Sequence, residues 1–159
     1  MKIAILGAGE SGVGAALLAN KIGAEVWLSD KGEIAEKYEQ VLAENKIPFE
    51  SGQHTKEKFF EAEMIVKSPG IPDRIALIQE LKAKGKLIVS EIEFAARYTD
   101  SWIIAVTGSN GKTTTAMLVH HILQKAEKDA WLGGNIGRSV ARELAERDHN
   151  YLVLEVSSF

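Results

Sequence analysis

Two glycine-containing loops, each placed between a short apolar run and a helical pattern, constrain the fold of this chain more than any other feature. The first occupies residues 7–12 and reads Gly-Ala-Gly-Glu-Ser-Gly, and the second occupies residues 107–114 and reads Thr-Gly-Ser-Asn-Gly-Lys-Thr-Thr. Loops of this kind join a buried strand to a helix whose N-terminus offers free backbone N–H groups to a phosphate. The 159-residue chain is therefore predicted to contain two phosphate-binding strand–loop–helix units.

Short apolar runs alternate with helical patterns along the whole chain, which is typical of α/β proteins with parallel sheets. We expect strands at residues 2–6, 25–29, 47–50, 64–67, 86–90, 102–106, 130–132 and 151–156. We expect helices at residues 13–22, 33–45, 56–61, 74–84, 91–98, 115–126 and 139–147. Because the pattern restarts at residues 99–101, the prediction is a Rossmann-like parallel-sheet domain at residues 1–98, followed by the beginning of a P-loop-type α/β ATPase domain at residues 99–159.

The composition excludes several classes of function. The chain has no Cys, so it holds no disulfide, cysteine nucleophile or thiolate metal site. Its 19 Lys and Arg against 22 Asp and Glu argue against a nucleic-acid-binding surface, which needs a basic excess. Its apolar runs are too short for membrane insertion, and residues 1–6 look like a first strand rather than a signal peptide. A cytoplasmic location is the expectation.

The first loop has the spacing Gly7-x-Gly9-x-x-Gly12, and Asp30 ends the next expected strand. In a nucleotide site, such glycines allow a tight turn, close approach of a pyrophosphate and close packing of the helix, while the acidic residue accepts hydrogen bonds from a ribose or base. The other interpretation is a glycine-rich turn without a ligand, with Asp30 as an ordinary turn former. The pattern favours a nucleotide but does not identify it.

The second loop indicates binding of a nucleotide triphosphate. Backbone N–H groups of the loop cradle the β-phosphate, Lys112 reaches the β- and γ-oxygens, and the Thr113 hydroxyl ligates Mg²⁺. The loop departs from the usual pattern because Val106 replaces the first glycine and Gly108 stands two residues later. The predicted ATP-binding residues are Gly108, Ser109, Asn110, Gly111, Lys112, Thr113 and Thr114.

Two further features fall at the expected carboxyl ends of strands. Glu155 stands near the end of the run Leu-Val-Leu-Glu-Val, where it either provides a second Mg²⁺ contact or forms a salt bridge with a basic side chain. The loop at residues 133–137, Gly-Gly-Asn-Ile-Gly, either places backbone N–H groups or the Asn135 amide on a ligand or is a plain turn. The four histidines have no metal-ligand spacing and are expected at the surface or partly buried.

Taken in order along the chain, these motifs resemble those of the Mur ligase family. Also part of the resemblance are residues 65–71 around Ser68-Pro69-Gly70, residues 91–93 and residues 152–159. The ATP loop is shared by all Mur ligases and by folylpolyglutamate synthases. The glycine opening, the Ser-Pro-Gly turn, the Gly-Gly-Asn-Ile-Gly loop and the terminal Leu-Glu-x-Ser-Ser-Phe together point to the branch of the family that adds D-glutamate.

The resemblance implies the ligands of both loops. The first domain would bind the uridine diphosphate of UDP-N-acetylmuramoyl-L-alanine rather than a nicotinamide cofactor. The implied substrate residues are Gly9, Glu10, Ser11, Gly12, Asp30, Ser68, Pro69 and Gly70, with Asn135 near the diphosphate and Ser157 near the muramoyl or alanyl part. The second domain would bind ATP and Mg²⁺, with Lys112, Thr113 and Glu155 as catalytic residues and the last two as magnesium contacts.

The implied reaction forms an amide. ATP phosphorylates the alanine carboxylate to an acyl phosphate, and the amine of D-glutamate attacks it with loss of phosphate from a tetrahedral intermediate. Family members have a longer central domain and a third domain, which supply further magnesium ligands, a carbamylated lysine and the adenine and D-glutamate sites. We therefore expect this 159-residue chain to be a fragment that is inactive alone, although its first domain binds the UDP-linked ligand weakly.

Three alternatives remain open at this stage. The first is another Mur-type acid–amino acid ligase, such as the alanine-adding enzyme. The second is a non-catalytic nucleotide-binding module that uses both sites for regulation. The third is an NAD(P)-dependent oxidoreductase, which explains the first loop and Asp30 but leaves the second loop and Glu155 without a role.

Overall fold

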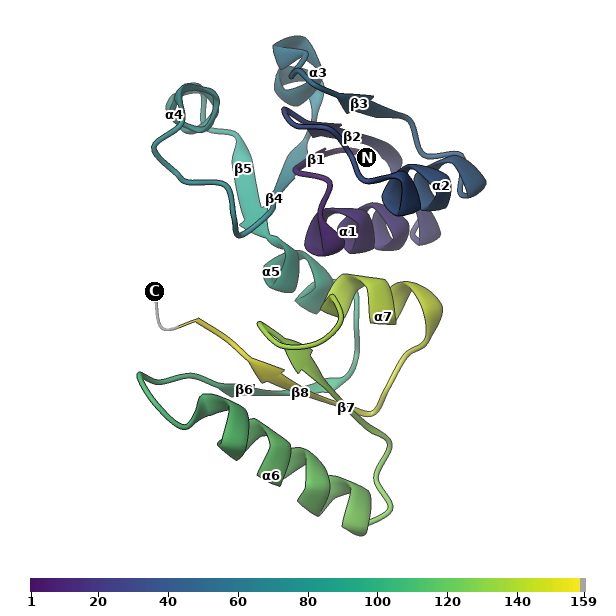
Figure 1. Cartoon of the computed structure of the whole chain (residues 1–159), viewed down its shortest axis with the longest axis vertical. Coiled ribbons are helices and arrows are strands. Elements are labelled where there is room, and N and C mark those ends of the chain that lie inside the picture. The colour runs from purple at the N-terminus through teal and green to yellow at the C-terminus, as the bar shows by residue number, and fades with distance from the viewer. Residues whose placement is uncertain (158–159) are drawn as a thin grey trace.

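The computed structural model describes residues 1–157 and contains two parallel sheets, one above the other in Figure 1. The expectation of an α/β protein with parallel sheets is confirmed. The last two residues of the terminal motif, Ser158 and Phe159, lie outside the described residues. No helix in residues 1–157 combines the length and the apolar character that crossing a membrane requires.

The first sheet unit consists of five strands and the five helices around them. The strand order is β3-β2-β1-β4-β5, and every neighbouring pair is parallel. The strands are β1 (Lys2–Leu6), β2 (Glu25–Asp30), β3 (Phe49–Ser51), β4 (Met64–Lys67) and β5 (Leu87–Ser90). The helices are α1 (Glu10–Lys21), α2 (Glu36–Glu44), α3 (Lys56–Glu61), α4 (Ala76–Ala83) and α5 (Glu91–Ala96).

The strand order of this sheet determines where a ligand can bind. The chain starts at the central β1, builds outward to β3, and then returns to place β4 on the other side of β1. At such a reversal the loops that leave neighbouring strands diverge, and a crevice opens at the carboxyl ends of the strands. The first glycine loop leaves β1 at this point and leads into α1.

The second sheet unit is smaller. Its strand order is β6-β8-β7, again parallel throughout, so the last strand in sequence is the central one. Its elements are β6 (Trp102–Val106), α6 (Lys112–Lys125), β7 (Ala130–Gly134), α7 (Val140–Glu146) and β8 (Tyr151–Glu155). Helix α6 covers one face of this sheet, and α7 lies on the other face, next to α1 and α5 (Figure 1).

The two sheet units share one hydrophobic core. A single cluster of buried residues includes Val13 and Ala16 of α1, Phe94 of α5, and Leu144 of α7. Helices α1 and α7 approach so closely at Gly14 that a Cβ atom there would lie 2.1 Å from the Oγ of Ser139. The units are therefore packed against each other through three helices rather than joined only by the chain.

The observed elements differ from the sequence prediction mainly at their ends. Helix α1 begins at Glu10, three residues before the predicted start, so that Gly12 and Gly14 lie inside it. Glycine normally lowers helix stability, but here a side chain at either position would collide with Gly7 or Ser139. Strand β7 continues to Gly134, beyond the predicted residue 132, because it pairs with β8 as far as Glu155.

Candidate functional site

A cavity of about 490 Å³ lies at the carboxyl ends of β1, β2 and β4, where the strand order reverses. We call it the first cavity. It is lined by Gly7, Gly9, Glu10, Ser11, Asp30, Lys31, His54, Ser68, Pro69, Gly70, Ile71 and Ile75. Seven of the predicted substrate residues are among these, although they come from three separate parts of the chain. Gly12, also predicted, does not line this cavity; it lies against the backbone of Gly7.

Asp30 uses both carboxylate oxygens within the protein. Oδ2 accepts a hydrogen bond of 2.7 Å from the backbone N–H of Ala8, and Oδ1 accepts one of 2.8 Å from Gly32. The turn-forming interpretation of Asp30 is thus realised, because the carboxylate joins the glycine loop to the turn after β2. Asp30 also lines the first cavity, so its remaining lone pairs are available to a ligand.

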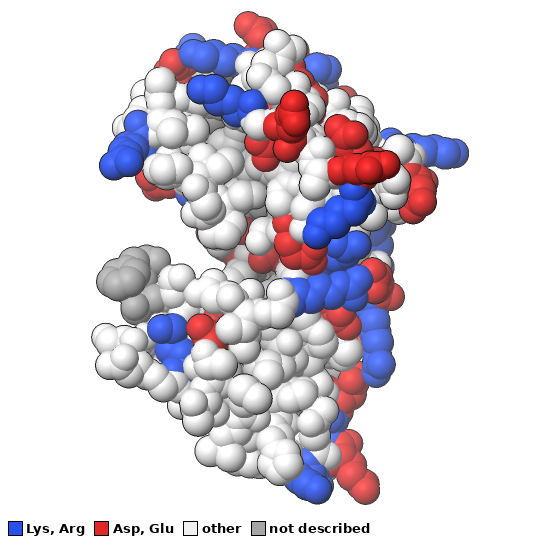
Figure 2. All heavy atoms as spheres, in the orientation of Figure 1, with Lys and Arg blue, Asp and Glu red and all other residues white. Residues whose placement is uncertain are grey.

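A second cavity of about 530 Å³ lies between the two sheet units, and Figure 2 shows the surface hollowed between them. We call it the inter-unit cavity. Glu10, Ser11 and Pro69 line both cavities, so the two lie next to each other. The second sheet unit contributes Gly134, Asn135, Gly137, Ser139, Val156 and Ser157, and the region around α5 contributes Ser90, Glu91 and Ile92.

Asn135 and Ser157, both predicted substrate residues, lie next to each other in the inter-unit cavity. The Asn135 side-chain amide donates a 2.7 Å hydrogen bond to the Ser157 Oγ, and its backbone N–H donates one of 2.8 Å to the carbonyl of Glu155. The loop that follows β7 is therefore held against the end of β8. This contact brings together two residues that the sequence places in separate motifs.

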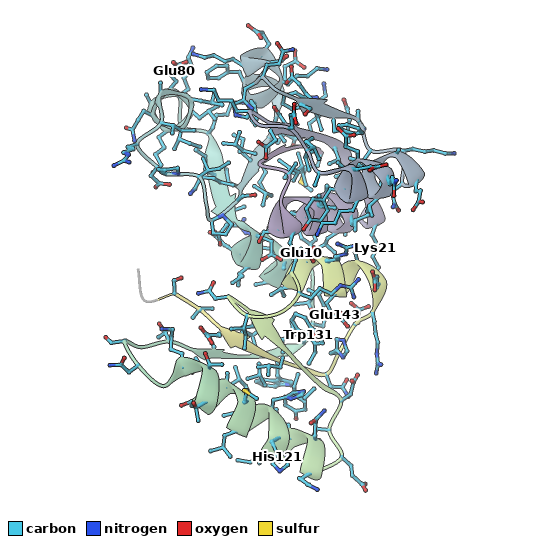
Figure 3. All side chains as sticks on the ribbon, viewed as in Figure 1. Glu10, Lys21, Glu80, His121, Trp131 and Glu143 are labelled. Atoms are coloured by element: carbon cyan, nitrogen blue, oxygen red, sulfur yellow. The ribbon has the colours of Figure 1, made fainter. Side chains whose placement is uncertain are left out.

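Glu10 connects the two sheet units as well as lining both cavities. Its Oε2 accepts a hydrogen bond of 2.9 Å from Nη1 of Arg142 in α7. Lys21, at the other end of α1, donates one of 2.7 Å to the carbonyl of Leu144. Figure 3 shows Glu10 and Lys21 on the side of α1 that faces α7. The Glu10 carboxylate thus orients α7 beside the cavities that both sheet units line.

The second glycine loop has the geometry of a phosphate-binding turn. Gly111 immediately precedes α6 with φ of 74°, a left-handed conformation that glycine adopts without strain. Lys112 is the first residue of the helix, and its Nζ donates a 2.9 Å hydrogen bond to the carbonyl of Gly108. The ammonium group is therefore folded over the loop, at the helix end where the backbone N–H groups are unpaired.

The Thr113 hydroxyl and the Glu155 carboxylate form a hydrogen-bonded pair beside this loop. The Thr113 hydroxyl donates a 2.6 Å hydrogen bond to Oε2 of Glu155, whose residue is only 7% exposed. Strand pairing aligns Val106 with Glu155, which brings the loop after β6 next to the end of β8. The described residues hold no cluster of three or more His, Cys, Asp or Glu suited to a metal. A hydroxyl and one carboxylate suit Mg²⁺, which keeps waters and phosphate oxygens in its shell.

The sequence analysis assigned no site role to two residues that line these cavities. His54 lines the first cavity, and Glu91 lies 5% exposed at the base of the inter-unit cavity. Burial raises the pKa of Glu91, although hydrogen bonds from Ala141 and Ser139 oppose this. Neither residue stands in a spacing that indicates a ligand. The signals for Glu91 were its place in the motif at residues 91–93 and its position at the end of an expected strand, where parallel sheets present functional groups.

A further cavity, of about 790 Å³, is far from these residues in the fold. It is lined by residues at the beginnings of β6 and β8, including Trp102 and Tyr151, and by residues 97–101. Parallel sheets present ligands at the carboxyl ends of their strands, and this cavity lies at the opposite edge. We therefore place the candidate site in the two smaller cavities and at the second loop.

The sequence matches two descriptions of known protein families. Residues 1–90 match "Mur ligase MurD-like, N-terminal domain", and residues 106–159 match "Mur ligase middle domain". The first match begins at the first residue and includes the whole first glycine loop. The second includes the second glycine loop and Glu155.

Curated relatives are similar over nearly the whole of this chain. The UDP-N-acetylmuramoylalanine--D-glutamate ligase of Porphyromonas gingivalis W83 is 55% identical over 157 residues, which are 99% of this chain and 35% of that protein. The enzyme of the same name from Christiangramia forsetii is 51% identical over 158 residues, or 99% of this chain and 36% of that protein. The chain thus spans about a third of the length of these relatives.

Solved structures share the fold. A murein peptide ligase from Psychrobacter arcticus superposes with a TM-score of 0.62 at 23% identity, over 100% of this chain and 38% of that one. A UDP-N-acetylmuramate-alanine ligase from Thermotoga maritima has a TM-score of 0.60 at 22% identity, over 99% of this chain and 37% of that one. With these matches to its sequence and its fold, the chain belongs to the Mur ligase family, and its N-terminal domain is of the MurD-like type.

Proposed function

We propose that this chain forms the UDP-substrate site and the ATP-phosphate loop of a ligase that joins D-glutamate to UDP-N-acetylmuramoyl-L-alanine at the expense of ATP. The observation that carries this proposal is that the two cavities are adjacent and share Glu10, Ser11 and Pro69 in their linings. One is a nucleotide-type crevice in the first sheet unit, and the other reaches the carboxyl ends of strands in the second. The relatives that are 51% and 55% identical bear the name of this activity.

The substrate would lie along the two cavities in one direction. Its diphosphate fits the N-terminus of α1, where the N–H groups of the first turn and the partial positive charge of the helix favour an anion. The nucleoside then occupies the first cavity beside Asp30, and the sugar and alanine extend into the inter-unit cavity toward Asn135 and Ser157. This direction places the alanine carboxylate on the side of the ATP loop.

ATP would bind with its phosphates on residues 108–114. Lys112, now paired with the Gly108 carbonyl, is within the same loop and would exchange that contact for phosphate oxygens. Thr113 and Glu155 fit Mg²⁺, which when bound neutralises phosphate charge and stabilises the transferring phosphoryl group. In the proposed reaction the alanine carboxylate attacks the γ-phosphorus of ATP, ADP leaves, and an acyl phosphate forms. The amine of D-glutamate then displaces phosphate and forms the amide.

Activity of the whole ligase requires more than the described residues provide. Two thirds of the length of the curated relatives has no counterpart in this chain. We therefore propose that the 159-residue chain binds ligands but forms no amide when ATP, D-glutamate and the UDP-linked substrate are supplied together. Amide formation by the purified chain, followed by mass spectrometry, would contradict this.

Calorimetric titration tests the proposed sites. The chain is expected to bind UDP-N-acetylmuramoyl-L-alanine and to show no preference for NADH; the reverse order of affinity would support an oxidoreductase instead.

The chain is also expected to bind Mg-ATP, and Lys112→Ala should weaken that binding about tenfold or more, since each charge-assisted hydrogen bond is worth about 1.5–3 kcal/mol. Lys125→Ala, at the far end of the same helix, is the matched control and should change nothing.

A further inference from the structure

His54 has a position in the first cavity that the proposed substrate site leaves unexplained. It follows β3 and precedes α3, and it lines the cavity together with Asp30 and Lys31. Its ring packs edge-on against Phe59, a fully buried residue, with ring centroids 5.8 Å apart and an interplanar angle of 87°. The ring is therefore held in place by the core rather than free to move in solvent.

One nitrogen of this ring is committed to a buried hydroxyl. Nδ1 of His54 lies 2.7 Å from the Oγ of Ser29, which is completely buried. The same Oγ is 3.0 Å from the carbonyl of Gln53 and 3.3 Å from Oε2 of Glu50. Burial raises the pKa of Glu50, but hydrogen bonds from Thr55 and other neighbours hold it below its usual value, so Glu50 is ionised and accepts only.

These contacts determine which ring nitrogen carries the proton. Ser29 has a single hydroxyl proton, and two of its three neighbours are oxygens that can only accept. If Ser29 donated its proton to His54, the Gln53 carbonyl and Glu50 Oε2 would both face lone pairs of the Ser29 Oγ, with no proton between the oxygens. The consistent arrangement is that Ser29 donates to Gln53 or Glu50 and that Nδ1–H of His54 donates to Ser29. Nε2 is then an unprotonated acceptor.

The acceptor nitrogen is available to a ligand. Nε2 of His54 has no hydrogen-bond partner among residues 1–157, and it is not among the polar atoms there that are buried without one. Burial lowers the pKa of His54, with Lys31 acting in the same direction and the carboxylates of Asp30 and Glu50 opposing. The ring is therefore neutral at neutral pH, and Nε2 carries an uncommitted lone pair on a residue that lines the cavity.

The layout of the cavities shows which part of a ligand meets this lone pair. The diphosphate belongs at the N-terminus of α1, and the sugar and peptide continue through Glu10 and Ser11 into the inter-unit cavity. The nucleoside must then lie at the other end of the first cavity, where Asp30, Lys31 and His54 are. This step rests on the proposed function.

We propose that His54 is a specificity-determining residue that selects uracil over cytosine by accepting a hydrogen bond from the N3–H of the base. Uracil carries a proton on N3, whereas N3 of cytosine is itself an acceptor. With cytosine bound, the lone pairs of His54 Nε2 and cytosine N3 would face each other, and both acceptors would be desolvated without a donor. A site built to accept a hydrogen bond from an N–H of its ligand rejects an analogue without that N–H far more strongly than an apolar pocket does.

The test compares UDP with CDP in calorimetric titrations of the 159-residue chain. The unmodified chain is expected to bind UDP about tenfold more tightly than CDP, which corresponds to about 1.4 kcal/mol. His54→Leu should reduce this ratio to about twofold or less, because the diphosphate contacts remain while the acceptor is lost. His121→Leu, on an exposed position of α6, is the control and should keep the full ratio.

Long-range nitrogen–proton NMR on the histidines of the unmodified chain gives a second readout that needs no variant. It should show His54 protonated at Nδ1, and UDP but not CDP should shift the Nε2 resonance. Equal affinity for UDP and CDP, a full ratio in His54→Leu, or a proton on Nε2 would overturn the inference, while UDP binding would still support the proposed function. A chain that binds neither nucleotide would overturn both.

Discussion

Gly9 and Gly12 belong to the same loop motif but have opposite surroundings. A Cβ at Gly12 would lie 1.8 Å from the carbonyl oxygen of Gly7, whereas a Cβ at Gly9 would meet nothing within 4 Å. Gly9 also has φ of −77°, which any residue adopts. The motif therefore combines a glycine required by the fold with one that leaves room for a ligand.

This difference predicts separate effects of two alanine substitutions. Gly12→Ala should destabilise the chain by about 3 kcal/mol or more, because backbone has to move to admit the methyl group. Gly9→Ala should change the free energy of unfolding by less than about 0.5 kcal/mol. It should nevertheless weaken UDP binding, since its methyl group occupies the approach of the diphosphate. Urea unfolding and calorimetry measure the two effects; equal loss of stability in both variants would contradict the assignment.

Among the elements, α7 depends on a carboxylate from another helix. Oε1 of Glu91, at the start of α5, accepts hydrogen bonds of 2.7 Å from the Ser139 hydroxyl and 2.6 Å from the Ala141 backbone N–H. Ser139 in turn caps α7 by accepting from the N–H of Arg142. The first turn of α7 is thus completed by α5, which orients the loop carrying Asn135.

Replacing Glu91 tests this contact. Glu91→Ala should lower the free energy of unfolding by about 1–3 kcal/mol, because the Ser139 hydroxyl and the Ala141 N–H lose their acceptor inside the protein. Glu91→Gln keeps an oxygen acceptor and is the matched control. It should retain most of the stability at neutral pH. An unchanged free energy of unfolding in Glu91→Ala would show that water replaces the carboxylate.

The unmodified chain and Glu91→Gln should also differ in how their free energy of unfolding depends on pH. Burial and the nearby Glu10 raise the pKa of Glu91 above its ordinary value of 4.5, despite its hydrogen bonds. The folded state then binds the proton more tightly than the unfolded state, so this stabilisation is complete below 4.5 and is lost as pH rises through the folded pKa. The glutamine of Glu91→Gln cannot titrate. As pH rises from 4.5 through the folded pKa of Glu91, the free energy of unfolding of this variant should therefore increase relative to that of the unmodified chain. A constant difference from pH 4 to pH 8, as measured by urea unfolding, would contradict the raised pKa.

The α6 helix shows how far periodicity predicts an element. Apolar residues at helical spacing, among them Leu118 and Ile122, predict a helix at residues 115–126, and the helix is present. Yet Leu118 and Ile122 are each 57% exposed, and Ala116 is the buried residue of the helix. The pattern identifies the apolar side chains of the helix but not the surface that covers them. Here the three-stranded sheet covers only part of the apolar face.

Over the whole molecule, the shared core predicts that the two sheet units unfold together. Leu144 of α7 is fully buried in the cluster that also contains residues of α1 and α5. Leu144→Ala should cost about 2–5 kcal/mol, as large-to-small substitutions in cores do. Leu118→Ala on the exposed side of α6 is the matched control, with an expected change within about 0.5 kcal/mol.

Tryptophan fluorescence distinguishes joint from separate unfolding. Trp27 packs against Phe59 in the first sheet unit, and Trp131 lies in β7 of the second. In chains that lack Trp102 and keep only one of these two tryptophans, the urea midpoints should coincide, and Leu144→Ala should lower both equally. Midpoints that separate would show two independent units and would support the predicted domain boundary at residues 98 and 99 as a boundary of stability.

The sequence by itself determined the alternation of strands and helices, both phosphate-type loops and the family, because these depend on local spacing and on residues that are adjacent in the chain. Only the tertiary structure decided that α1 begins at Glu10, that Asp30 holds the first loop, and that His54 and Glu91 line the cavities of the candidate site. Each of these depends on contacts between distant residues, such as Glu91 and Ser139, which are 48 positions apart. A local pattern carries no record of such a contact, because packing decides which distant side chains meet.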